Sequence, residues 1–115
     1  MVEWYHGYLT HRNIFLELNN DSTSASTNIG FPQGGVCSAH FWIIAFDEAI
    51  NIANKHGFRG NGFADDIGTV MGGFRPDLII NRAQKLLNKI IGWGNRCGLT
   101  FNGKKTVVVL FQASS

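Results

Sequence analysis

Apolar residues recur at helical spacing in the middle of the chain. The stretch of residues 39–54 follows Ser38, a residue type that favours helix N-caps, and precedes Gly57, which suits a left-handed helix end. Its apolar positions are Trp42, Ala45, Phe46, Ala49, Ile52 and Ala53. This spacing predicts a strongly apolar helix that is covered on more than one side.

A second helical pattern begins after Gly72 and Gly73, with Pro76 and Asp77 in its first turn, and ends at Gly98. Its apolar face comprises Ile79, Ala83, Leu86, Leu87, Ile90 and Cys97, and its cations, mostly off that face, are Arg82, Lys85, Lys89 and Arg96. We expect these cations to form a solvated helix face, the usual arrangement on a surface helix.

Strand-like segments surround the two helices. Residues 5–12 suggest the end of a helix or a loop, residues 13–18 are β-rich, residues 19–21 signal a turn, and a polar arm returns over residues 24–29. Residues 99–101 and 106–111 predict a second hairpin around residues 102–105. With a further hairpin between the helices, the order β-β-α-β-β-α-β-β predicts an α+β fold in which two helices cover one face of an antiparallel sheet.

The hairpin between the helices carries two adjacent carboxylates. Asp65 and Asp66 lie between short apolar runs within residues 62–72, and Asp favours turns over strands, so the pair is predicted at or beside the bend. Neighbouring carboxylates repel, and a divalent cation removes that penalty; oxygen-only ligands suit Mg²⁺ or Mn²⁺. The alternative is a double Asp that only caps a solvated turn.

Composition narrows the class of protein. The 115 residues allow one domain or part of one, and the net charge of +2 is too small to indicate nucleic-acid binding by itself. Cys37 and Cys97 are too far apart in sequence for a local zinc or redox motif, so reduced thiols are expected. The amino terminus has no signal-peptide pattern and the longest apolar run, residues 41–46, is too short to cross a bilayer, so we expect an intracellular protein of the nucleus or cytoplasm.

Three motifs follow one another in a characteristic order. The first is the loop Gly30-Phe31-Pro32-Gln33-Gly34-Gly35 before the first helix, the second is Phe63-Ala64-Asp65-Asp66, and the third is Gly98-Leu99-Thr100-Phe101-Asn102 followed by Lys104-Lys105-Thr106. Together they resemble the reverse transcriptase domain, and the Phe41-Trp42 continuation is most similar to enzymes of non-LTR retrotransposons. The resemblance covers residues 8–111.

The resemblance implies roles for individual residues. Gly30, Pro32, Gln33 and Gly34 match a loop that in this family lies against the template base and the incoming nucleotide. Asp65 and Asp66 match the catalytic carboxylates that hold Mg²⁺ for nucleotidyl transfer to a primer 3′-hydroxyl. Phe63 stands where the family often has Tyr, and Lys105 matches a Lys that places positive charge near the leaving phosphates, although a solvated turn Lys explains it equally well.

One departure from the family pattern limits what the chain is expected to do. The family uses a third Asp on an earlier strand, and Glu3, Glu17 and Asp21 match no such motif. Residues 1–115 are therefore interpreted as a partial reverse transcriptase domain, the later part of the palm, inactive alone, whose partners would be RNA template, DNA primer, deoxynucleoside triphosphates and the rest of the polymerase chain. The alternatives are a non-catalytic remnant that binds RNA or a protein, and a palm of the maturase or telomerase type.

Overall fold

The computed structural model describes residues 2–111 and shows an α+β fold, as predicted. The elements in chain order are α1 (Val2–Leu9), β1 (Arg12–Leu18), β2 (Asp21–Thr27), α2 (Ser38–Lys55), β3 (Arg59–Phe63), β4 (Asp66–Val70), α3 (Pro76–Arg96) and a 3₁₀ turn, η1 (Gly103–Lys105). The strands form two separate antiparallel hairpins, β1–β2 and β3–β4. The two predicted helices therefore cover one hairpin instead of a wider sheet.

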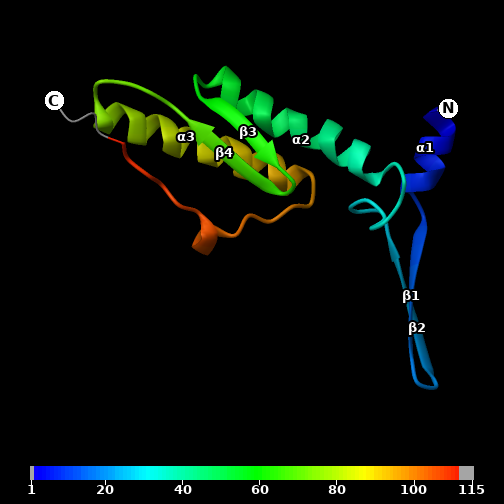
Figure 1. Ribbon diagram of the computed structural model, residues 1–115. Helices are drawn as coiled ribbons and strands as arrows, with labels where there is room; N and C mark the ends of the chain where they lie inside the picture. Colours follow the sequence, from blue (N-terminus) through cyan, green and yellow to red (C-terminus); the bar gives the residue numbers. More distant parts are fainter. Residues whose placement is uncertain (1, 112–115) are drawn as a thin grey trace.

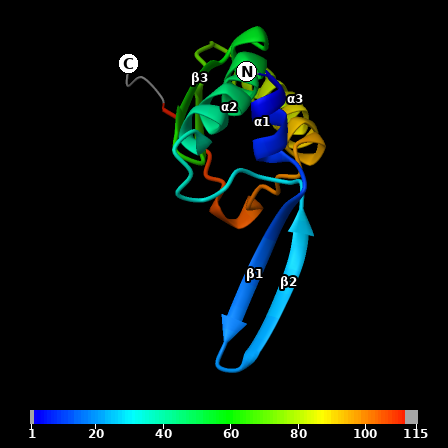
Figure 2. The same cartoon turned by 90° about the vertical axis from the view of Figure 1, so that its right-hand side faces the viewer.

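The core lies where α2, α3 and the β3–β4 hairpin meet (Figures 1 and 2). Phe46 and Ala49 of α2 pack with Trp93 near the end of α3, whereas Ala53 packs with Leu86, nearer the middle of α3. Later residues of α2 thus contact earlier residues of α3, so the two helices run antiparallel. Ile67 of β4 contacts both clusters and closes the layer on the sheet side.

Two glycines allow β3 to approach α2 closely. A Cβ atom on Gly62 would lie 2.5 Å from the Phe46 ring, and one on Gly60 would lie 3.0 Å from the Cβ of Ala53. Both distances are below ordinary van der Waals contact. The glycines of this hairpin therefore do more than mark its ends: they set the distance between the strand and the helix.

The β1–β2 hairpin extends away from this layer (Figures 1 and 2). Its register, from Arg12 opposite Thr27 to Leu18 opposite Asp21, leaves Asn19 and Asn20 as the turn, and Asn19 takes a positive φ of 56°. At the base, the Arg12 guanidinium donates to the carbonyls of Ile29 and Gly30 at 3.0 and 2.6 Å. This hairpin confirms the predicted strand and a polar return arm, although the arm runs over Asp21–Thr27 instead of residues 24–29 because Asp21 already pairs with Leu18. The segment before the hairpin is helical, as α1 shows.

Ser38 and Cys97 differ from their predicted places. Ser38 is the first residue of α2 and not its N-cap; Cys37 holds that position without a side-chain bond, and the Ser38 hydroxyl instead donates to the Pro32 carbonyl at 2.5 Å. Cys97 lies past the end of α3 and is exposed, so it does not belong to the buried face, where Trp93 and Gly94 lie instead. Both cysteines are free thiols, as expected.

The predicted hairpin of residues 99–111 is wrong. Leu99 N–H donates to the Gly94 carbonyl at 2.8 Å, and Phe101 packs at 6.4 Å from the Trp93 ring, which holds the first predicted strand against α3. The Asn102 side chain accepts from Lys104 N–H at 3.1 Å and opens η1. This local side-chain bond competes with hairpin pairing, and residues 106–111 consequently extend without a partner strand among the described residues.

Within residues 2–111, no helix has the length and hydropathy needed to span a membrane.

The close approach of β3 to α2 predicts the effect of adding one methyl group. Gly62→Ala is expected to lower the free energy of unfolding by about 1–3 kcal/mol, because the new Cβ would overlap the buried Phe46 ring. Gly68→Ala on the paired strand is the control, since its Cβ would meet nothing nearer than 3.9 Å. Urea titrations that gave equal midpoints for the two variants would contradict this account of the packing.

Candidate acidic hairpin site

The turn of the β3–β4 hairpin presents both predicted carboxylates. Phe63 pairs with Asp66, so Ala64 and Asp65 form the two-residue turn and Asp66 is the first residue of β4. Ala64 takes a positive φ of 52°, a backbone conformation that residues other than Gly adopt rarely. Asp65 and Asp66 are both exposed, and the predicted position of the pair at and beside the bend is confirmed.

A tryptophan from α2 holds this turn in place. The indole N–H of Trp42 donates to the Ala64 carbonyl at 2.8 Å, and the indole stacks on the Phe46 ring with centroids 5.1 Å apart. The donor therefore comes from a side chain that is itself packed against the core. In the sequence, Trp42 indicated an apolar helix position and part of the Phe41-Trp42 continuation, but no contact with the hairpin. The signal for that contact is that a half-buried indole N–H usually finds an acceptor.

The predicted loop of residues 30–35 has an ordered backbone. Gly30 and Gly34 take φ values of 75° and 78°, which glycine adopts without strain. The Pro32 carbonyl accepts from Gly35 N–H at 3.0 Å and from the Ser38 hydroxyl, which ties the loop to the first residue of α2. Gln33 is exposed and leaves its amide available to a ligand.

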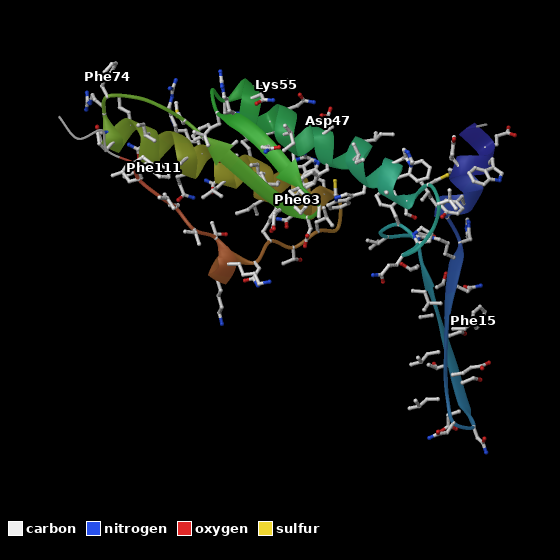
Figure 3. All side chains as sticks on the ribbon, in the orientation of Figure 1. Phe15, Asp47, Lys55, Phe63, Phe74 and Phe111 are labelled. Carbon is white, nitrogen blue, oxygen red and sulfur yellow. The ribbon has the colours of Figure 1, made fainter. Side chains whose placement is uncertain are left out.

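The loop and the acidic turn both lie toward the amino end of α2, because Ser38 contacts the loop and Trp42 contacts the turn (Figure 1). Phe63, next to the turn, is 82% exposed, and Figure 3 shows it at the end of the hairpin. Lys105 comes from η1, on the other side of α3 in sequence, and within residues 2–111 it forms no hydrogen bond or ion pair with either aspartate.

The donor chemistry of Asp65 and Asp66 fits a hard divalent cation, since both supply only carboxylate oxygens. The described residues nevertheless contain no group of three His, Cys, Asp or Glu side chains placed to hold a metal ion. The hairpin thus presents two adjacent carboxylates, with no third such side chain grouped with them among the described residues.

A comparison with protein families identifies the family to which the chain belongs. Residues 2–114 match the model of the family described as reverse transcriptase (RNA-dependent DNA polymerase). This chain belongs to the reverse transcriptase family. Searches among curated proteins and among solved structures found no match. Reverse transcriptases are RNA-directed DNA polymerases that in general use divalent metal ions and bind template, primer and deoxynucleoside triphosphates.

The indole contact predicts a local change in hairpin protection. Trp42→Phe keeps the aromatic packing but removes the N–H that holds the turn, and a lost hydrogen bond of about 1 kcal/mol corresponds to roughly fivefold faster amide exchange in residues 59–70. Trp4→Phe is the control, because Trp4 is 58% exposed and lies in α1. Hydrogen exchange followed by mass spectrometry measures both; unchanged hairpin exchange in Trp42→Phe would refute the anchoring role.

Proposed function

We propose that residues 1–115 are the later part of a reverse transcriptase palm, from an element of the non-LTR retrotransposon type, and that Asp65 and Asp66 are its catalytic carboxylates. The observation that supports this most directly is the pair of exposed carboxylates at the end of a hairpin seated on α2. A pair that served only to cap a turn would not need a turn fixed by a tryptophan from a neighbouring helix.

Each residue of the proposed site has a distinct task. Asp65 and Asp66 would hold Mg²⁺, or Mn²⁺, and when bound these ions activate the primer 3′-hydroxyl and stabilise the leaving pyrophosphate. Phe63 presents an exposed ring on which a base or sugar can stack. Lys105 contributes a positive charge on η1 for phosphates.

The loop residues Gly30, Pro32, Gln33 and Gly34 are proposed to contact the template base and the incoming nucleotide. Glycines with positive φ let the backbone approach a base closely, and Pro32 stiffens the segment. The loop is tied to α2 at Ser38, and the acidic turn is tied to the same helix at Trp42. This common support favours one site that both segments share.

A second candidate is a non-catalytic remnant that binds RNA or a protein. The absence of a third acidic ligand beside Asp65 and Asp66, within the part of the chain that the structure describes, favours it. Exposed apolar side chains in residues 107–111 are also what a surface covered by another chain would present.

Substitution of one carboxylate separates these functions. In a longer chain that also supplies the upstream strand with the third Asp, Asp65→Asn is expected to lower primer extension by several orders of magnitude without unfolding the domain, because the carboxylate acts only through the metal ions. Asp21→Asn, in the other hairpin, is the matched control and should leave extension unchanged. A lowered melting temperature of Asp65→Asn with normal extension would instead identify Asp65 as a turn-capping residue.

The isolated chain of residues 1–115 is expected to bind Mg²⁺ weakly and not to polymerise DNA. Its two carboxylates form an incomplete set, and the outer edges of the β3–β4 hairpin and residues 106–111 leave backbone groups free to pair with other chains. The measurement is incorporation of labelled nucleotide on a primed RNA template, first with Mg²⁺ and then with Mn²⁺. Incorporation above that of the Asp65→Asn/Asp66→Asn variant would show that the chain completes its own metal site.

A further inference from the structure

The carboxyl end of α2 and the middle of α3 enclose a basic concavity. It is an open hollow of about 450 Å³ lined by Lys55, His56, Gly57, Arg82 and Lys85. None of these five residues is acidic. Figure 3 shows Lys55 at the carboxyl end of α2, at the opposite end of the β3–β4 hairpin from Phe63.

The antiparallel packing of the two helices brings these cations together. Ala53 and Leu86 share one core cluster, so the residues that follow Ala53 on α2 face those that precede Leu86 on α3. Gly57 then turns the chain with a φ of 79° into β3. The sequence alone indicated a solvated face for Arg82 and Lys85, which is the usual arrangement on a surface helix. Lys55 and His56 lie more than twenty residues earlier in the chain, so the helical pattern could not group them with these two residues.

Within residues 2–111, the cations of the basic concavity form no ion pair with an acidic side chain. The ion pairs formed within residues 2–111 join Arg75 with Asp77 and Arg96 with Glu48, and neither involves Lys55, Arg82 or Lys85. The Nδ1 atom of His56 lies 2.8 Å from the Ile52 carbonyl and must donate there, because a carbonyl oxygen only accepts. That bond sets the orientation of the ring.

Helix capping explains only half of this cluster. Lys55 and His56 lie at the carboxyl end of α2, where positive charge stabilises the helix dipole. Arg82 and Lys85 lie well inside α3, where the dipole has no such effect. Like charges repel around a shared hollow, and an anion with several acceptor oxygens removes that repulsion.

We propose that the basic concavity binds phosphate groups, either those along a nucleic-acid strand or that of a free nucleotide. Arg and Lys together suit phosphate, because the guanidinium forms paired hydrogen bonds and the ammonium adds charge. The concavity is a separate site from the acidic turn: the five residues of β3 place the two ends of the hairpin about 17 Å apart. The proposal therefore does not rest on catalysis by Asp65 and Asp66.

The test compares two double variants of residues 1–115 that lose equal charge. Arg82→Gln/Lys85→Gln removes the α3 side of the concavity, whereas Arg96→Gln/Lys104→Gln removes two exposed cations outside it. Fluorescence anisotropy with a labelled oligouridylate of about twelve nucleotides measures binding from about 50 to 200 mM salt, and circular dichroism checks that both variants fold. Uridine monophosphate is titrated separately as the free phosphate ligand.

We expect the concavity variant to lose at least tenfold in oligonucleotide affinity at low salt and the control less than threefold. The slope of log affinity against log salt should become shallower by about 1.4 in the concavity variant, since each phosphate contact to a single strand contributes about 0.7. Weakened binding of the monophosphate alone would support the site with a free nucleotide as its ligand. Equal losses in both variants, or no binding of either ligand, would overturn the proposal.

Discussion

The packing of Phe46 between three elements is the interaction on which this structure depends. The centroid of its ring lies 6.2 Å from that of Trp93 on α3 and 5.1 Å from that of Trp42 on its own helix. The backbone of Gly62 approaches the same ring from β3. This one side chain thus packs α2 against α3 and sets the packing distance between α2 and the acidic hairpin. The buried core is small, so few other contacts could replace this one.

The local chemistry of the sequence was sufficient to predict the elements around this core. Helical spacing of apolar residues indicated α2 and α3, and Pro76 marked the beginning of α3. The acid hairpin followed from glycines on both sides of Asp65 and Asp66. These predictions are confirmed because each signal acts within a few residues, where the period of the chain and the preferences of single residues decide the conformation.

Features that depend on contacts distant in sequence were missed or wrong. Nothing near Trp42 in the sequence shows that its N–H reaches the Ala64 carbonyl, 22 residues later. Residues 106–111 have strong β preference, but a strand needs a partner, and here the Asn102 turn and the packing of Phe101 on Trp93 direct the chain elsewhere. The grouping of Lys55 with Arg82 likewise depends on how two helices pack and not on either helix alone.

The amino end of α2 also acts as a spacer of fixed length. Ser38 holds the Pro32 carbonyl of the loop, and Trp42, four residues later, holds the Ala64 carbonyl of the turn. Four residues of α-helix correspond to about 6 Å of rise, a distance that changes little without breaking backbone hydrogen bonds. A molecule bound against the loop would therefore be positioned relative to the two carboxylates by a rigid segment. Inserting one residue between Ser38 and Trp42 would leave the indole in register with the turn but would rotate Ser38 and its loop by about 100° around the helix axis.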